Sequence, residues 1–547
     1  MIEARGVTCF AKFPLDRFAG QCSAVFPIEE IMSAAAFIST TIPYVNARPH
    51  LGHALEYVQA DAFARHMASQ KDVFFLSGTD ENSLKNVLAA EREGISTREL
   101  VDRNVHFFET LLESLNIKVS DFIRTSVSTN HIAGATQIWR RMEERDDIYT
   151  KDYEGLYCVG CEQFYTPDEL KDGKCPEHLV EPELVTERNY FFRLSRYGNQ
   201  LLEELSSGRL KIYPESRLNE VTSFIRAGLE DISISRSVER ARGWGIPVPD
   251  DESQVMYVWI DALTNYINAL GWTEEKDAYK CFWADADQRT HVVGKGVLRF
   301  HAIYWPAMLL SAGLPLPTEV MVHGYITAGG QKLSKSLGNA IDPMDLLRDY
   351  GQDALRYLLL ADFSPFGDGD FSQERLVTRY NTDLANALGN LLSRITAMTV
   401  RYREGVLPES GPLGAPEEAL LEQASVSTRE ADAAMERYDH REALARIWDL
   451  VRRTNAYVDE RAPWHLAKAA AQGDARAAQE LDSVLHHAYR VLQRLGVLLR
   501  PFIPQASANM LSALNESPEC RIADLVVNPA GRRIEKAAPL FPKLELA

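Results

Sequence analysis

Two pairs of basic side chains, far apart in the sequence, have the types and spacing that phosphate chemistry needs. The segment HLGH at residues 50–53 places two imidazoles on one face of the first turn of an expected helix. Backbone N–H groups at a helix start favour an anion, and Gly52 leaves room for a flat base or a phosphate. The segment KLSKS at residues 332–336 follows two glycines, and the compact ammonium groups of Lys332 and Lys335 can meet charge that develops on a phosphate. Either motif alone is also typical of a solvated surface. Together they predict a nucleoside triphosphate site.

Four potential metal ligands form two arms with matching spacing. Cys158 and Cys161 make a C-x-x-C arm, and Cys175 and His178 make a C-x-x-H arm. Three thiolates and one imidazole suit tetrahedral zinc, and a complete set of four protein ligands leaves no position for a reacting water. We therefore expect one structural zinc ion rather than a catalytic one. A redox-active C-x-x-C is the alternative, and the second arm argues against it.

The composition limits the class of protein. The chain has 547 residues and a formal charge of −18, from 59 Lys and Arg against 77 Asp and Glu. This length suggests three or four domains. No apolar run is long enough for a membrane-spanning helix, and the acidic balance excludes a protein that coats nucleic acid by bulk charge, although not a local basic track. The seven cysteines favour a reducing cytosol over a secreted disulfide framework. Residues 1–33 carry no convincing secretion signal and are treated as an extension of unknown purpose.

Short apolar strands are expected to position the chemically active side chains. The candidate strands lie near residues 36–42, 73–76, 291–293 and 319–322, and each runs into a turn. A helix is expected from near Pro49 through His66, since proline suits a helix start. This pattern predicts an open parallel α/β sheet, which binds ligands beyond the carboxyl ends of its strands. The weakly periodic residues 146–250 are expected to form an insertion that splits the sheet, and residues 381–514 are almost entirely helical in pattern.

The two basic motifs resemble the HIGH and KMSKS signatures of class I aminoacyl-tRNA synthetases, with Leu51 and Leu333 as the departures. Further segments resemble the corresponding segments of methionyl-tRNA synthetases, namely residues 37–45, 77–80, 256–266 and 297–305. The resemblance covers about residues 36–545. One further departure is visible: the family commonly reads T-D-E-H-G where this chain reads TDENS at residues 79–83.

The resemblance implies an α/β fold with a Rossmann-like parallel-sheet catalytic domain, split by a zinc-binding insertion and followed by an all-α anticodon-binding bundle. The expected domains are an N-terminal extension (1–33), two Rossmann halves (34–145 and 251–324), a connective insertion with a zinc knuckle (146–250), a KMSKS-loop and stem-contact region (325–380), and a helical anticodon-binding domain (381–547). We do not expect the family's appended OB-type domain, and therefore expect a monomer.

The resemblance also implies the residues of the site. The implied methionine pocket is Ile42, Tyr44, Asp80, Trp259, Ala262, Tyr266, Val297 and His301. The implied ATP site is His50, Gly52, His53, Gly294, Lys295, His323, Gly324, Lys332, Ser334 and Lys335, with His50, His53, Lys332 and Lys335 as the catalytic residues. The chemistry agrees, because a thioether makes favourable contacts with aromatic ring edges and Asp80 can hold the substrate ammonium. From pattern alone, Trp259 and Tyr266 are typical of an ordinary core.

Three residues in the helical part resemble the family's anticodon-reading positions. Asn390 and Arg394 lie four residues apart, which places them on one helical face, and Trp464 follows an Ala-Pro helix break. Proteins read single-stranded loops by stacking bases on aromatic rings and by hydrogen bonds to base edges. A core tryptophan beside a surface ion pair is the structural alternative.

The implied activity is that of a methionine–tRNA ligase, which joins L-methionine to tRNA(Met), initiator tRNA included, through methionyl-adenylate. One structural Zn²⁺, Mg²⁺ bound with ATP, and a cytoplasmic location without membrane attachment are expected with it. Another class I synthetase, such as the cysteinyl enzyme, is the first alternative. A small-molecule adenylyltransferase that shares the HxGH motif and a non-catalytic tRNA-binding or scaffold protein are the others. The short insertion and the closed ligand set argue against other class I synthetases. An adenylyltransferase does not predict Trp464 or the zinc insertion, and the intact His50, His53, Lys332 and Lys335 argue against a non-catalytic protein.

Overall fold

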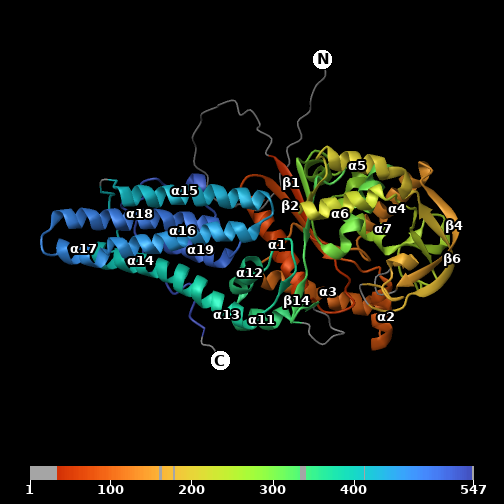
Figure 1. The fold of residues 1–547 in the computed structure, drawn as a ribbon, viewed down its shortest axis with the longest axis horizontal. Coiled ribbons are helices and arrows are strands. Elements are labelled where there is room, and N and C mark those ends of the chain that lie inside the picture. Colours follow the sequence, from red (N-terminus) through yellow and green to blue (C-terminus); the bar gives the residue numbers. More distant parts are fainter. Residues whose placement is uncertain (1–33, 159–162, 177–178, 333–340, 412, 545–547) are drawn as a thin grey trace, which may run out of the picture. The chain divides into compact units, whose positions relative to one another are not determined.

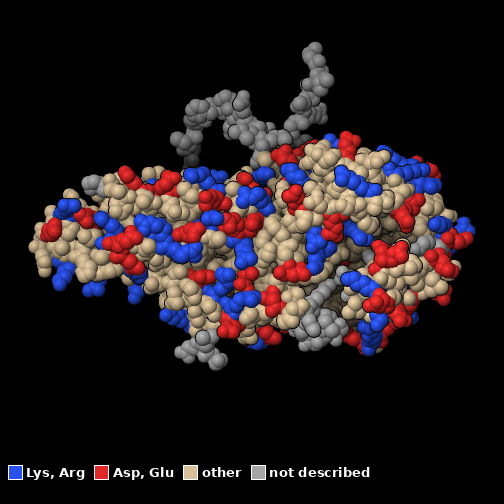
Figure 2. Space-filling view, viewed as in Figure 1, with Lys and Arg blue, Asp and Glu red and all other residues tan. Residues whose placement is uncertain are grey.

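The computed structural model describes residues 34–158, 163–176, 179–332, 341–411 and 413–544. The chain divides into two compact units. Unit 1 comprises Met1–Arg48, Gln70–Phe107 and Val119–Val322, and unit 2 comprises Pro49–Ser69, Phe108–Lys118 and His323–Ala547. Among the described helices, none combines the length and the apolar character needed to cross a lipid bilayer. On the face drawn in Figure 2, acidic and basic side chains are interspersed.

A six-stranded sheet forms the centre of unit 1, in the order β3-β2-β1-β12-β13-β7. Its strands are β1 (Ala35–Ser39), β2 (Asp72–Thr79), β3 (Asp121–Arg124), β7 (Lys211–Tyr213), β12 (Gln288–Gly294) and β13 (Glu319–His323). The pairings β1–β2, β2–β3, β1–β12 and β13–β7 are parallel. The parallel sheet predicted from the apolar strands is therefore confirmed.

Two details of the sheet differ from the sequence prediction. β1 ends at Ser39 rather than Ile42: the Thr40 backbone N–H still donates to the Leu76 carbonyl oxygen at 3.1 Å, and the following Pro43 has no N–H to continue the ladder. β7 lies inside the range expected as an insertion, yet Ile212 pairs with Val320 of β13. The expected domain boundaries themselves stay a prediction.

The remaining strands of unit 1 form two smaller sheets. The antiparallel sheet β5-β4-β6-β8 consists of β4 (Ile148–Cys158), β5 (Gln163–Tyr165), β6 (Glu183–Phe192) and β8 (Ile232–Ser233). The sheet β10-β11-β9 consists of β9 (Ser235–Ser237), β10 (Pro247–Val248) and β11 (Asp251–Met256).

Helices and π-helical turns surround the central sheet of unit 1. They are α2 (Leu84–Glu93), the start of α3 (Thr97–Ser114), α4 (Thr129–Glu144), α5 (Gly198–Ser206), α6 (Glu215–Arg226), α7 (Val258–Leu263), α8 (Asn265–Asn268), α9 (Asp277–Tyr279), η4 (Lys280–Ala284), η6 (Phe300–Tyr304) and α10 (Trp305–Ala312). Ser83 caps α2 and Ser128 caps α4 through their side chains. The core includes the fully buried rings of Phe37, Trp139, Trp283 and Trp305.

Unit 2 is mainly helical. Its elements are α1 (Leu51–Met67), β14 (Ile326–Ala328), β15 (Gln331–Lys332), α11 (Pro343–Tyr350), α12 (Gln352–Ala361), β16 (Gly369–Asp370), α13 (Gln373–Arg379), η8 (Tyr380–Gly389), α14 (Asn390–Arg403), α15 (Ala415–Glu436), α16 (His440–Arg461), α17 (Pro463–Ala470), α18 (Ala475–Leu499) and α19 (Pro504–Ala513). The long helices α15, α16 and α18 pack along one another (Figure 1). The helical pattern predicted for residues 381–514 is confirmed, with its break at Ala462-Pro463.

Candidate functional site

The two histidines of HLGH cap helix α1 in a reciprocal way. The Gly52 backbone N–H donates to His50 Nδ1 at 3.1 Å, and the His50 backbone N–H donates to His53 Nδ1 at 3.1 Å. The two rings stack with their centroids 3.9 Å apart. Since each Nδ1 accepts a hydrogen bond, the proton of each neutral ring sits on Nε2, the atom that can donate to an anion. The helix start thus offers two oriented imidazole N–H groups together with its own backbone dipole.

Gly52 is needed here because of the His50 ring. A Cβ on Gly52 would lie 2.9 Å from His50 Cε1 and 3.0 Å from Nδ1. The sequence suggested that this glycine lets a ligand approach the backbone. The structure adds that the neighbouring imidazole already fills the space of a side chain.

His323 ends strand β13 of the central sheet and is buried. Its Nε2 lies 2.8 Å from Glu56 Oε2 on α1, and its Nδ1 lies 2.8 Å from the Gly324 carbonyl oxygen. Gly324 packs against the backbone of Gly367, where an added Cβ would approach the carbonyl carbon to 2.2 Å. The sequence analysis missed Glu56. Its position three residues after His53, on the same face of α1, is the signal that could have found it.

The lysine motif is only partly described. Lys332 lies in β15, where it pairs with Thr327 of β14, whereas Ser334 and Lys335 lie outside the described residues. The described chain resumes at Ile341, whose carbonyl oxygen accepts the Leu51 backbone N–H at 3.3 Å. The two motifs therefore belong to one unit, and the residue that follows the undescribed segment touches the first helical residue of HLGH. Gly294 and Lys295, at the end of β12, belong to unit 1.

The polar end of the expected methionine pocket is held by an ordered pair. The Tyr266 hydroxyl donates to His301 Nε2 at 2.7 Å, and His301 Nδ1 donates to the Val297 carbonyl oxygen at 2.9 Å. A carbonyl only accepts, so the ring proton is on Nδ1 and Nε2 must accept from the hydroxyl. His301 lies in the π-helical turn η6, a geometry often found at functional sites.

The aromatic side of the same pocket is also assembled in unit 1. Trp259 stacks on Phe300 with centroids 3.8 Å apart, and Tyr44 meets Trp259 edge-on at 6.4 Å. Tyr44 forms a parallel bridge with Asp80, whose backbone N–H donates to the Pro43 carbonyl oxygen at 2.9 Å. Ala262 is buried one helical turn after Trp259 on α7, and Ile42 and Val297 pack on the same core cluster.

The sequence analysis also missed His291, which lies in β12 beneath this pocket. Its ring contacts that of Tyr266 at a centroid distance of 4.1 Å, and its Nδ1 lies 2.8 Å from Ser39 Oγ. Complete burial, reinforced by the neighbouring His301, lowers the pKa of His291 well below its usual range, so the ring stays neutral. In the sequence, only the position of His291 at one end of a predicted strand could have indicated this residue.

The segment that departs from the family pattern has a defined conformation. Asn86 Nδ2 donates to the carbonyl oxygens of Asp80 at 3.2 Å and Glu81 at 2.9 Å, and Trp244 Nε1 donates to the Glu81 carbonyl oxygen at 2.7 Å. The Glu81 side chain is buried and pairs with Arg124 at 2.6 Å. Backbone carbonyls in this turn are thus satisfied by side chains.

Two of the three expected anticodon-reading residues lie together. The Arg394 guanidinium is 5.8 Å from the centroid of the Trp464 ring and pairs with Asp459 at 2.6 Å. Trp464 is 40% exposed, which is unusual for so large an apolar side chain. Asn390 is exposed at the start of α14, one turn before Arg394.

The expected zinc ligands are half described. Cys158 and Cys175 are buried and pack with Tyr165 in a small cluster, while Cys161 and His178 fall outside the described residues. The chain turns back after Cys175, whose carbonyl oxygen accepts the Leu179 N–H at 2.9 Å. No group of three or more potential metal ligands occurs among the described residues, which exclude two of the expected four.

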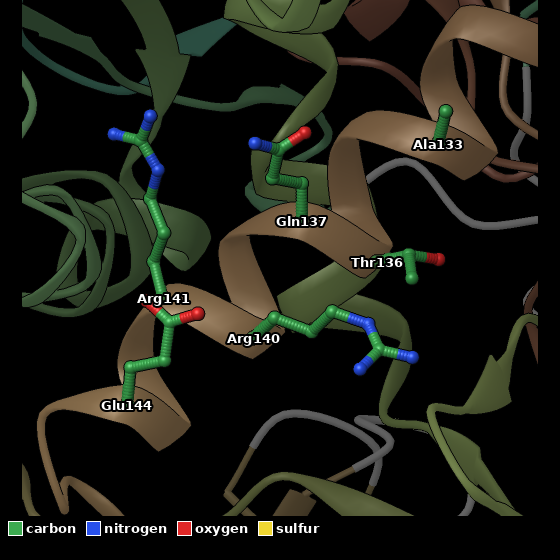
Figure 3. A pocket seen from close by; sticks show the side chains of 6 residues that line it. All are labelled: Ala133, Thr136, Gln137, Arg140, Arg141 and Glu144. Atoms are coloured by element: carbon green, nitrogen blue, oxygen red, sulfur yellow. The ribbon is translucent and has the colours of Figure 1, made fainter.

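A separate hollow follows the outer face of α4 and contains none of the expected site residues. It is lined by Ala133, Thr136, Gln137, Arg140, Arg141 and Glu144 (Figure 3). Arg141 lies over the ring of Trp272, 5.0 Å from its centroid, and donates to the Ala312 carbonyl oxygen.

Comparison with known proteins decides the family. A family described as "tRNA synthetases class I (M)" matches residues 36–181 and 167–396, and one described as "Anticodon binding domain of methionyl tRNA ligase" matches residues 407–546. The chain belongs to the methionyl-tRNA synthetase family.

Relatives within the methionyl-tRNA synthetase family match over nearly the whole chain. The methionine–tRNA ligase of Caldanaerobacter subterraneus subsp. tengcongensis is 42% identical, over 94% of this chain and 80% of its own length. The enzyme of Brucella suis biovar 1 is 41% identical, over 93% of this chain and 97% of its own. The structure of Mycobacterium tuberculosis methionyl-tRNA synthetase in complex with methionyl-adenylate is 37% identical, with a TM-score of 0.89 over 93% of this chain and 100% of that one. The class I α/β fold with a helical anticodon-binding part is therefore confirmed.

Proposed function

We propose which residues act in each of the two steps of the ligase reaction. The chain is a methionine–tRNA ligase. The observation that supports this assignment is the reciprocal histidine cap at the start of helix α1, which fixes two imidazole rings in the same unit as the lysine motif.

In the first step a carboxylate oxygen of methionine attacks the α-phosphorus of ATP. The bond from that phosphorus to the bridging oxygen breaks, and diphosphate leaves with the electron pair. Such transfer depends on positioning and on charge stabilisation. We assign this role to His50, His53, Lys332 and Lys335, with Gly52, Gly294, Lys295, His323, Gly324 and Ser334 beside the nucleotide. Magnesium bound with ATP supplies further charge neutralisation.

Methionine is held by its two different ends. The side chain of Asp80 accepts the ammonium group, and Tyr44 and Trp259 present ring edges and faces to the thioether. Tyr266 and His301 close the polar side, and Ile42, Ala262 and Val297 complete the apolar walls.

In the second step the 2′-hydroxyl of the terminal adenosine of tRNA(Met) attacks the carbonyl carbon of methionyl-adenylate. The carbonyl carbon–phosphate oxygen bond breaks and AMP leaves. Trp464 stacks on an anticodon base, and Arg394 and Asn390 contact base edges. The same reading serves elongator and initiator tRNA, because both carry the methionine anticodon.

The proposal also includes a structural zinc ion, the domain boundaries, the oligomeric state and the location in the cell. Cys158, Cys161, Cys175 and His178 hold one structural Zn²⁺, an assignment supported by the two buried thiols that pack together. Zinc analysis of the purified protein tests it. The expected domain boundaries, a monomeric state and a cytoplasmic location are proposed with it. A doubled mass in light scattering at micromolar concentration would contradict the monomer.

Two variants separate the two steps. Lys335→Ala is expected to reduce methionine-dependent ATP–diphosphate exchange by orders of magnitude while methionine affinity stays near that of the unaltered chain. Trp464→Ala is expected to leave the exchange unchanged and to raise the KM for tRNA(Met) by about five- to 150-fold, as the loss of one base stack of roughly 1–3 kcal/mol predicts.

Exchange assays with each amino acid and charging assays with tRNA(Met) provide the measurements. His465→Ala, beside Trp464 on α17, is the matched control for the tRNA assay. Equal loss of exchange and methionine binding in Lys335→Ala, or loss of exchange in Trp464→Ala, would show that the roles are assigned wrongly.

A further inference from the structure

Five buried or half-buried polar side chains form a hydrogen-bonded series at helix α7, which carries Trp259 and Ala262. It consists of Trp272, Asn268, His131, Asp261 and Asn82, and lies entirely within unit 1. Asp261 sits on α7 between Trp259 and Ala262, and Asn82 is the second residue after Asp80. This series of hydrogen bonds therefore joins the Asp80 turn to helix α7, the two segments that are proposed to hold the two ends of methionine.

The hydrogen bonds of this series lead toward the Asp261 carboxylate from both ends. Trp272 Nε1 can only donate, and it lies 2.6 Å from Asn268 Oδ1. The Asn268 amide nitrogen therefore faces His131, at 3.2 Å from both Nδ1 and the carbonyl oxygen, and it also donates to Thr264 Oγ1 at 2.8 Å. His131 Nε2 lies 2.5 Å from Asp261 Oδ1, and because a carboxylate oxygen only accepts, Nε2 carries a proton and donates it.

Asn82 supplies the second donor to the same carboxylate. Its Nδ2 lies 2.7 Å from Asp261 Oδ2, so that both carboxylate oxygens accept a hydrogen bond. His131 and Asp261 are fully buried. Losing either donor would be costly in free energy, because a buried carboxylate that loses a donor keeps the full penalty of its desolvation. The Asn82 amide is thus held at a fixed distance from α7.

The surrounding backbone is shaped around this network. Gly134 of α4 faces Asn268, and a Cβ there would lie 1.9 Å from Asn268 Oδ1. The guanidinium of Arg141 covers the ring of Trp272 from the α4 hollow shown in Figure 3. The network is therefore built into the packing of α4 against α7 and α8 rather than exposed to solvent.

We propose that Asn82, Asp261 and His131 form a positioning network that sets the separation of the Asp80 turn from helix α7 for methionine binding. Asn82 is a positioning residue that acts through Asp261 and does not touch the substrate. This inference rests on the proposed methionine pocket. The proposal gives a role to Asn82, which stands where the family's T-D-E-H-G pattern has histidine. The amide N–H of asparagine and the imidazole N–H of histidine can both donate to the Asp261 carboxylate.

The test compares three variants of Asn82 with a matched control in methionine-dependent ATP–diphosphate exchange. Asn82→Ala removes the donor and is expected to raise the KM for methionine about tenfold or more, as loss of a hydrogen bond to a buried charge predicts. Asn82→Asp places two carboxylates together and is expected to raise it further. Asn82→His keeps an N–H donor and is expected to restore a value within about threefold of the unaltered chain. The KM for ATP is expected to stay within about twofold in all three.

The control is Asn219→Ala on the exposed face of α6, which removes an asparagine amide in the same unit. Thermal unfolding is measured for each variant. The proposal is overturned if folded Asn82→Ala keeps the methionine KM of the unaltered chain, if both KM values rise together, or if Asn82→His is no better than Asn82→Ala. An unaltered chain without methionine-dependent exchange would overturn the proposed function instead. In that case, equilibrium dialysis would compare the methionine affinity of the Asn82 variants with that of the unaltered chain and so test the positioning network by itself.

Discussion

At the scale of single residues, the histidines of HLGH make the backbone contacts that a serine or aspartate makes at other helix starts. This capping fixes the ring orientation through Nδ1, so that the proton of a neutral ring is on Nε2, the atom that we propose to face the nucleotide. His301 and His131 are ordered in the same way by partners that can only donate or only accept. In each case the tautomer, and with it the direction in which the ring can donate, is decided by a neighbour.

Gly52→Ala is expected to impair adenylate formation more than stability. The new Cβ would overlap the His50 ring, which must then leave the cap at a cost of about 1 kcal/mol. Misplacing a catalytic group by about 1 Å reduces turnover by roughly a hundredfold, so kcat for diphosphate exchange is expected to fall about that much.

Gly198→Ala is the matched control for this prediction. Gly198 likewise lies in the first turn of a helix, α5, and a Cβ there meets nothing closer than 3.7 Å. Stopped-flow measurement of adenylate formation and thermal unfolding compare the two variants. Unchanged adenylate formation in Gly52→Ala would show that the ring position is not set by this contact.

At the scale of elements, helix α1 is held by buried polar contacts along its length. Asp61 pairs at 2.7 Å with Arg356 of α12, and Gln59 lies 3.0 Å from His440 at the start of α16. The Arg356 guanidinium also donates to the carbonyl oxygens of Leu115, Pro501 and Phe502. A single buried side chain thus joins α1, α12 and the segment after α18 within unit 2.

Arg356→Met is expected to lower the free energy of unfolding by about 3–5 kcal/mol, because Asp61 would lose the fully buried one of its two cationic partners, the other being Arg65, and three buried carbonyl oxygens would lose a donor. Arg348→Met on α11 is the control, since Arg348 is exposed and its ion pairs with Asp345 and Asp349 contribute little. Urea unfolding followed by circular dichroism gives both values. Similar small losses in the two variants would contradict a structural role for the buried pair.

At the scale of the whole molecule, buried histidines make stability depend on pH. Burial lowers the pKa of His440 to about 4, against a weaker opposing effect of its hydrogen bond to the Leu360 carbonyl oxygen. Burial also lowers the pKa of His66, His291, His486 and His487. Each of these rings therefore takes up its proton at a lower pH in the folded chain than in the unfolded chain.

The free energy of unfolding is therefore expected to be highest above pH 6.5 and to fall as the pH drops from about 6.5 toward about 4. In that window the unfolded state binds more protons than the folded state. His440 alone accounts for at most about 3 kcal/mol of this loss, from a shift of about two and a half pKa units.

The measurement is urea unfolding at several pH values, for the unaltered chain and His440→Gln. The variant lacks a titrating ring at this site, so its stability is expected to fall less steeply with decreasing pH. His106→Gln, at an exposed position of α3, is the control. Parallel pH profiles for the unaltered chain and His440→Gln would show that this ring does not contribute.

The sequence by itself determined the features that local patterns encode. The strands and helices follow from apolar runs and helical periodicity, and HLGH, KLSKS and the segments around Trp259 and His301 pointed to the family and its pocket. These signals are short in sequence and depend on residue type and spacing, so no knowledge of distant contacts was needed.

Only the tertiary structure decided which distant residues complete the site. Asn82 and Asp261 are 179 positions apart, and His291 and Ser39 are 252 positions apart, yet each pair is in hydrogen-bond contact. Likewise β7 joins the central sheet from within the expected insertion. Such partners are selected by the register of strands and the packing of helices, in which many weak contacts act together. The type of one residue therefore does not reveal which residue far along the chain will satisfy it.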